Sequence, residues 1–207
     1  MIGTLNETNL REASHWLAEQ DETLDRVLKK YGYPPLWSRE PSFSTLVHII
    51  LEQQVSLASA NAAFAKLQAA MGTVGVDKFL KISDEDLRSI GFSRQKIRYA
   101  RLLAEAIQSG DFDLEQLAGL SDEAVSIRMK QLKGIGDWTA HIYLSECLLR
   151  PDILPKGDIA LLEAFKVLKG LPQRPAHDEL IAGTEHWRPW RSVGIRMLWH
   201  FYLCERR

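Results

Sequence analysis

Helical periodicity with repeated start and stop signals is the feature that most constrains the fold of this chain. Apolar residues recur every three to four positions, serine or aspartate precedes many of these segments, and glycine follows them. In the segment 83–91, for example, Ser83 is placed to cap a helix and Gly91 to end it. No segment alternates apolar and polar residues as a half-buried strand does. The pattern predicts an all-α protein of about ten to twelve helices.

The N-terminal segment 10–32 carries this pattern over its whole length. Leu10, Leu17 and Leu24 fall on one helical stripe, and Gly32, which two prolines soon follow, supplies a stop signal. We therefore expect one helix here, then a proline-containing linker, and then a helix that Ser42 caps.

The 207 residues suffice for one compact unit or for two small helical lobes that share a core. We expect a central lobe of residues 42–146, and a second lobe made of residues 1–41 together with 147–207. A cleft between two such lobes is the default ligand site.

Composition describes an ordinary soluble protein. The chain is 45% hydrophobic and 26% charged, no apolar stretch is long enough to cross a membrane, and the N-terminus lacks the pattern of a secretory signal. We expect an intracellular protein without membrane association. Cys147 and Cys204 are far apart and form no metal-binding pair, so zinc and iron–sulfur clusters are not expected.

The formal net charge of −1 argues mildly against a nucleic-acid partner, because clustered basic charge drives phosphate binding. It is the best support for one alternative, a helical scaffold or protein-interaction module. If the chain binds DNA, its affinity should be modest and should fall with added salt.

The segment LKGIGD, residues 132–137, lies between two expected helices. Gly134 and Gly136 let the backbone turn tightly and leave its amides open, and Leu132 and Ile135 are placed to anchor the turn in the core. Amides at the start of a helix form a site for a phosphate oxygen. The pattern suits binding to the DNA backbone, although a plain helix–helix turn is the simpler interpretation of two glycines alone.

LKGIGDWTA, with LPKGDIALLEAF downstream, resembles the helix-hairpin-helix signature of the base-excision-repair DNA glycosylases. Further segments resemble the alkylpurine (3-methyladenine) branch of that superfamily, and they are ILEQQVSLASANA, GFSRQKIRYARLLAEAI and WRPWRSVGIRMLWHFY. Several segments match in order, and together they cover residues 42–205. The resemblance implies the two-lobed helical fold of that superfamily.

The resemblance implies that Asp158 is the catalytic carboxylate, although alone it would be interpreted as a helix N-cap. Breaking an N-glycosidic bond builds positive charge on the deoxyribose, which a carboxylate stabilises while it orients or deprotonates water. Trp138 stands where bifunctional members carry a Schiff-base lysine, and Lys133 does not match that place. We therefore expect a monofunctional enzyme without AP-lyase activity.

Tryptophans supply the expected base pocket. Trp138 and Trp199 match pocket aromatics of the alkylpurine branch, and indole faces attract a flipped purine that alkylation has made positive. Ile142 stands where the best-known bacterial members carry a tyrosine, so the pocket should differ in shape. The tryptophans assigned to the core are Trp16, Trp187 and Trp190.

The expected DNA contacts come from two segments. Gln54 matches the wedge residue that fills the gap left by a flipped nucleotide, and Gln53 is the neighbour that competes for this assignment. The hairpin residues assigned to DNA are Lys133, Gly134, Ile135, Gly136 and Thr139. By resemblance, backbone carbonyls can hold a monovalent cation that bridges to phosphate, and they belong to Lys130, Leu132 and Ile135. No other cofactor is expected.

These features predict a monomeric DNA glycosylase that flips and excises alkylated or otherwise damaged purines from double-stranded DNA. The main alternative is a non-catalytic helix-hairpin-helix DNA-binding protein. Asp158 in its context and the two pocket tryptophans favour the enzyme.

Overall fold

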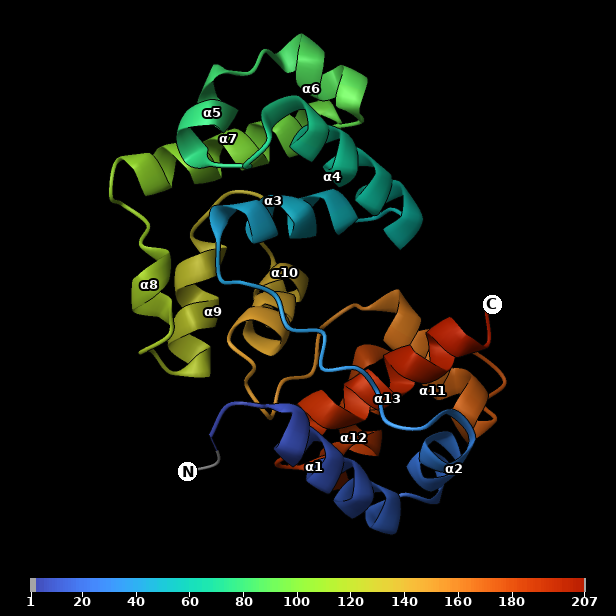
Figure 1. Cartoon of the computed structure of the whole chain (residues 1–207). Coiled ribbons are helices and arrows are strands. Elements are labelled where there is room, and N and C mark those ends of the chain that lie inside the picture. The colour runs from blue at the N-terminus through green and yellow to red at the C-terminus, as the bar shows by residue number, and fades with distance from the viewer. Residues whose placement is uncertain (1–2, 207) are drawn as a thin grey trace. The chain divides into compact units, whose positions relative to one another are not determined.

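The computed structural model describes residues 3–206, which form thirteen α-helices, one π-helix and one 3-10 helix, and no strand (Figure 1). The prediction of an all-α protein is confirmed. Contacts divide the chain into unit 1, residues 1–38 and 144–207, and unit 2, residues 39–143. Residues 1, 2 and 207 of the predicted second lobe lie outside the described residues.

Unit 1 is built around its last helix, α13 (Arg191–Cys204), which packs against α11, α2 and α1 (Figure 1). Its other helices are α1 (Glu7–Gln20), α2 (Glu22–Tyr31), α11 (Ile159–Lys169), α12 (His177–Gly183) and the 3-10 helix Glu185–Trp187. Leucines of α1 and α2 meet Leu161, Phe165 and Met197 in one buried cluster. The apolar stripe in the sequence is therefore the face that builds this core.

The stripe at 10–32 does not form one helix, so that prediction is wrong. Asp21 is extended, with φ −140° and ψ 106°, and it ends α1 and caps α2. Its carboxylate accepts hydrogen bonds from the Thr23 amide at 2.9 Å, Trp187 Nε1 at 3.0 Å and Lys169 Nζ at 2.8 Å. Burial raises the pKa of Asp21, but these hydrogen bonds outweigh it and hold the pKa at about 2.

We expect Asp21→Asn to lower the free energy of unfolding at neutral pH. A folded pKa of about 2 against 3.8 corresponds to about 2 kcal/mol of stability. Because the folded pKa is depressed, this contribution is complete above the unfolded value and is lost as pH falls through the folded one. Urea unfolding of both proteins should therefore show a gap that closes toward about pH 2. A gap of equal size at every pH would assign the loss to packing instead.

Arg196 holds α13 in place although its side chain is charged and fully buried. Its guanidinium donates to the carbonyl oxygens of Leu36 at 2.8 Å, Ser192 at 2.8 Å and Ser145 at 2.6 Å. Burial lowers the pKa of Arg196 to about 10, although the negative charge of Glu146 acts to raise it. These bonds tie the linker after α2 and the π-helix (Tyr143–Cys147) to α13.

Unit 2 places α3 (Phe43–Glu52) against α4, α7 and α10 (Figure 1). The other helices of the unit are α4 (Leu57–Met71), α5 (Val76–Lys81), α6 (Asp84–Ile90), α7 (Arg94–Gln108), α8 (Leu114–Leu117), α9 (Asp122–Lys130) and α10 (Asp137–Ile142). Ser42 and Ser83 cap α3 and α6 as the sequence predicts, and Gly91 ends α6. These boundaries could be predicted from the sequence because capping residues act on the backbone within one turn.

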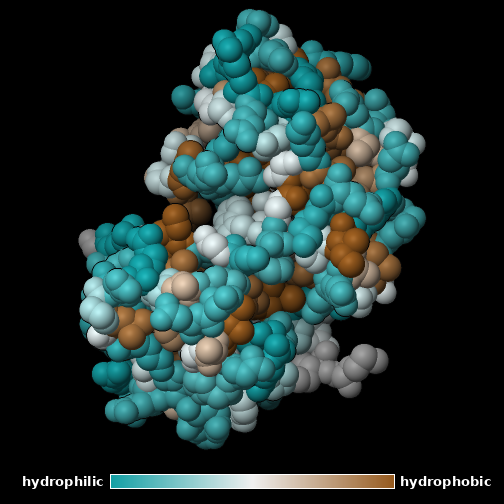
Figure 2. Space-filling model, turned by 180° about the vertical axis from the view of Figure 1, so that it is seen from behind, coloured by the Kyte–Doolittle hydropathy of each residue, from teal (hydrophilic) through white to brown (hydrophobic). Residues whose placement is uncertain are grey.

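Hydrophilic side chains dominate the face drawn in Figure 2, with smaller hydrophobic patches between them. Within residues 3–206, no helix has the length and apolar character needed to cross a membrane.

Candidate functional site

The hairpin, residues 132–136, joins α9 to α10 within unit 2. Gly134 has a φ of +93°, and a Cβ atom built on it would lie 2.1 Å from Tyr99 Cγ, so only glycine fits there. Ile135 is buried, and its amide donates to the Leu132 carbonyl at 3.1 Å. Gly136 is extended and opens α10, with open space where a side chain would start.

The two sides of the hairpin are exposed to different degrees. Lys133 at its tip is exposed, whereas Thr139 in the first turn of α10 is 2% exposed. Lys130 Nζ lies 2.7 Å from Asp137 Oδ1 and so bridges the ends of α9 and α10. Thr139 is therefore packed inside unit 2, and the exposed residues of this segment are Lys133 and Gly136.

The turn between α3 and α4, residues 53–56, is here called the wedge turn. Gln54 is exposed and has a left-handed backbone, with φ 57°. Gln53 is half-buried, and its Nε2 donates to the Gly134 carbonyl and to Thr139 Oγ1, at 3.0 Å each. Val55 and Leu57 beside Gln54 are 46% and 50% exposed. The free-standing side chain at the tip is therefore that of Gln54, with apolar neighbours suited to contact nucleobases.

Asp158 stands at the start of α11 in unit 1, where its Oδ1 accepts a hydrogen bond from the Leu161 amide at 2.9 Å. Trp199 Nε1 also donates to this oxygen, at 3.4 Å. The residue is only 9% exposed. Both of its sequence interpretations are thus compatible, since the carboxylate caps the helix and also meets a predicted pocket tryptophan.

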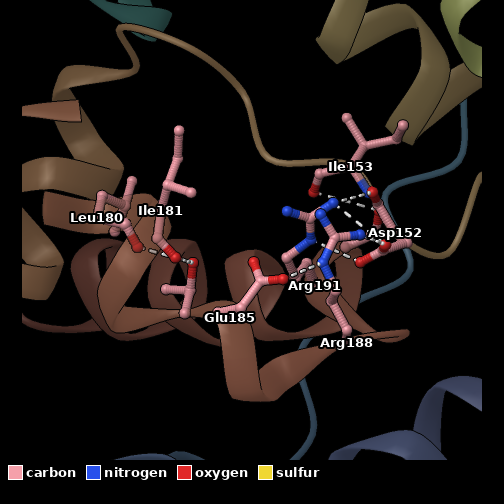
Figure 3. A network of polar contacts seen from close by, with 9 residues as sticks. Asp152, Ile153, Leu180, Ile181, Glu185, Arg188 and Arg191 are labelled. Atoms are coloured by element: carbon pink, nitrogen blue, oxygen red, sulfur yellow. Dashed lines mark hydrogen bonds and ion pairs between the residues drawn. The ribbon is translucent and has the colours of Figure 1, made fainter. Parts of the chain in front are cut away.

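A salt-bridge network fixes the segment that leads to Asp158. Asp152 accepts from Arg191 Nε at 2.6 Å and from Arg188 Nη1 at 2.5 Å, and Arg188 also pairs with Glu185 (Figure 3). The neighbouring Ile153 amide donates to Ser192 Oγ at 2.9 Å. These contacts attach the loop before Asp158 to the start of α13, the helix that carries Trp199.

Trp37 adds an aromatic ring beside Trp199 that the sequence analysis missed. The two ring centroids lie 6.3 Å apart with an angle of 77° between the planes. Trp37 comes from the linker after α2 and has a φ of 46°. Only the tertiary structure brings this linker residue to α13, because no local pattern relates the two positions.

The other predicted pocket residues, Trp138 and Ile142, lie in α10 of unit 2, where Trp138 is half-buried and Ile142 is 3% exposed. Of the tryptophans assigned to the core, Trp187 is 1% exposed, and Trp16 and Trp190 pack on the core of unit 1.

The candidate cation ligands remain a prediction. The Leu132 carbonyl already accepts the Ile135 amide within the turn. Among the residues the structure describes, no cluster of three or more His, Cys, Asp or Glu side chains could hold a metal ion. Cys147 and Cys204 are free cysteines.

Comparison with known proteins identifies the family of this chain. The model of the HhH-GPD superfamily of base excision DNA repair proteins matches residues 47–189. DNA-3-methyladenine glycosylase 1 of Schizosaccharomyces pombe is 31% identical over 93% of this chain and 87% of its own length. The structure of a 3-methyladenine DNA glycosylase of that yeast with abasic DNA superposes with a TM-score of 0.86, at 30% identity over 91% of this chain and 95% of that one.

A second solved relative is a DNA-3-methyladenine glycosidase from Bacillus halodurans, with a TM-score of 0.73 and 30% identity over 93% of this chain and 91% of its own. The chain belongs to the HhH-GPD superfamily of base excision DNA repair proteins, in its alkylpurine glycosylase branch.

Proposed function

We propose that this protein is a DNA glycosylase that hydrolyses the N-glycosidic bond of alkylated purines in double-stranded DNA. The observation that carries the proposal is the nearly buried Asp158 carboxylate, which is held by the start of α11 and by the Trp199 indole. Membership of the alkylpurine branch supports the assignment of this carboxylate to catalysis.

In the proposed reaction the base leaves first, and the deoxyribose gains positive charge. The negative charge of Asp158 stabilises that cation, and its oxygen orients or deprotonates the attacking water. Hydrogen bonds from Leu161 and Trp199 fix the carboxylate before the substrate arrives. Such preorganisation lets one charged group act in the chemical step without a metal, so the proposed chemistry requires no cofactor.

Selectivity would come from stacking. In the proposed pocket, a flipped purine stacks on the ring of Trp199, which donates a hydrogen bond to Asp158 within unit 1. Trp138 and Ile142 remain the candidates that the family resemblance assigns to the same task. A purine that carries an alkylation-derived positive charge gains cation–π attraction from indole faces. The lesion would be recognised as an electron-poor ring.

DNA would be held by the hairpin backbone and by the wedge turn. Main-chain amides of the hairpin at the exposed Gly136 would face the phosphate, and Gln54 would fill the space that the flipped nucleotide leaves. The proposed hairpin cation, on the carbonyls of Lys130, Leu132 and Ile135, would add a bridge to phosphate. We propose that the protein acts as a monomer.

The same proposal assigns base removal without strand cleavage. AP-lyase chemistry needs an amine that forms a Schiff base with the sugar, and Trp138 occupies the matching position. The product would therefore be an intact strand with an abasic site.

The test is base release from methylated duplex DNA. We expect nicks after incubation with the protein and heating with alkali, above a control without protein, and intact strands when the alkali step is omitted. Binding without nicks would favour the non-catalytic DNA-binding protein. Nicks without alkali would contradict the absence of lyase activity, and neither binding nor nicks would overturn the proposal.

A further inference from the structure

Gln53 joins two parts of unit 2 that the proposed function uses separately. Both hydrogen bonds of its amide nitrogen cross to the other segment, one to the Gly134 carbonyl and one to Thr139 Oγ1. A primary amide has two N–H donors, and here each of them has one acceptor at 3.0 Å. The half-buried side chain therefore joins the wedge turn directly to the hairpin.

The next residue, Gln54, has a backbone that needs such support. A non-glycine residue with φ 57° is uncommon, and it persists when surrounding contacts determine the conformation. Lys96 holds the preceding end of α3, since its Nζ donates to the Leu51 carbonyl at 2.6 Å. The chain is thus held at two points, Leu51 and Gln53, just before the residue with the left-handed backbone.

Helix α7 supplies a second, indirect path between the same two segments. Lys96 on this helix contacts the end of α3, and Tyr99 one turn later packs its ring on Gly134 of the hairpin. The wedge turn, the hairpin and the start of α7 therefore form one closed set of contacts, all inside unit 2. In that set, the Gln53 side-chain amide is the direct link between the wedge turn and the hairpin backbone.

We infer that Gln53 is a positioning residue that couples binding of the DNA backbone by the hairpin to insertion of Gln54 into the duplex. When the hairpin is fixed on a phosphate, the two bonds of Gln53 fix the wedge turn relative to that phosphate. Gln54 then meets the base stack at a set position. This inference rests on the proposed function, and it assigns to Gln53 a task that differs from that of the wedge residue itself.

The test compares three variants with the wild type. Gln53→Met removes both hydrogen bonds at nearly constant shape, Gln54→Ala removes the wedge side chain, and Gln68→Met makes the first change at an exposed glutamine of α4. Each protein is measured for single-turnover base release from a methylated duplex and from a methylated single strand. Fluorescence of a 2-aminopurine beside the lesion reports flipping, and affinity for undamaged duplex reports the hairpin.

We expect Gln53→Met to slow release from the duplex about tenfold and to reduce the fluorescence change, as Gln54→Ala does. Release from the single strand, where no stack must be opened, and affinity for undamaged duplex should change less than about threefold. The double variant Gln53→Met/Gln54→Ala should be no slower than Gln54→Ala alone, because both changes act on one step. Gln68→Met should match the wild type.

The coupling would be overturned if Gln53→Met showed the same 2-aminopurine fluorescence change as the wild type. It would also be overturned if the rate losses of the two single variants multiplied in the double variant. An equal loss on duplex and single strand would also overturn it, because a general defect in the fold would act on both. If thermal unfolding shows that Gln53→Met does not fold, Gln53→Asn replaces it, since its shorter amide cannot span both acceptors. A wild type that releases no base refutes the proposed function instead, so the two failures are distinguishable.

Discussion

Asp158→Asn should abolish base release while DNA binding stays nearly intact. Asparagine is as good an N-cap as aspartate, so its side-chain oxygen can still accept from the Leu161 amide and keep α11 in place. It carries no charge, however, and cannot stabilise the sugar cation. We expect the single-turnover rate on methylated duplex to fall about a thousandfold, which corresponds to about 4 kcal/mol of transition-state stabilisation.

The matched control is Asp113→Asn, which makes the same change at the aspartate that caps α8 in unit 2. That variant should retain the wild-type rate, and both variants should unfold at nearly the wild-type temperature. Fluorescence anisotropy with a labelled duplex gives the affinity of each protein. A near-full rate for Asp158→Asn would remove this residue from the chemistry, and lost affinity with unchanged chemistry would reassign it to binding.

The second large effect is expected at the hairpin. Gly134→Ala should weaken binding to undamaged duplex by about tenfold or more, because the new Cβ atom cannot share space with the Tyr99 ring. The ring or the hairpin must shift, and either shift displaces the amides proposed to face the phosphate. The left-handed φ of Gly134 adds a backbone cost of about 1–2 kcal/mol.

Gly136→Ala is the control for this prediction. Gly136 has a negative φ of −106°, and no atom lies within 4 Å of the position where its Cβ would stand. Alanine there should leave the unfolding temperature unchanged. Salt titrations of duplex affinity compare the two variants, and equal losses would show that any methyl group in the hairpin blocks DNA. Unchanged affinity in Gly134→Ala would contradict the role of the hairpin.

The site divides into residues that sequence identifies and residues that it does not. The hairpin turn was predicted from a local signal, namely glycines one residue apart. Asp158 was assigned to catalysis by the family resemblance, because its local signal alone, an acidic residue ahead of an apolar helix, predicts an N-cap. The family resemblance assigned the wedge to Gln54, with Gln53 as the competing neighbour, because both sit at a helix end. The structure distinguishes them by the partners of the Gln53 amide, which lie 81 and 86 residues away.

Sequence by itself determined the helical class, the serine caps and the family resemblance, because helix periodicity and capping act within a few residues. Tertiary contacts, together with the local cap that Asp21 makes with the Thr23 amide, decided where the first predicted helix breaks. Asp21 lies within an unbroken apolar stripe, but its carboxylate binds Lys169 and Trp187, far along the chain. Tertiary structure alone decided that Trp37 stands beside Trp199. The helix propensity of a residue amounts to only a fraction of a kcal/mol, and hydrogen bonds and packing between distant segments outweigh it, as at Asp21. A local sequence pattern contains no information about such long-range contacts.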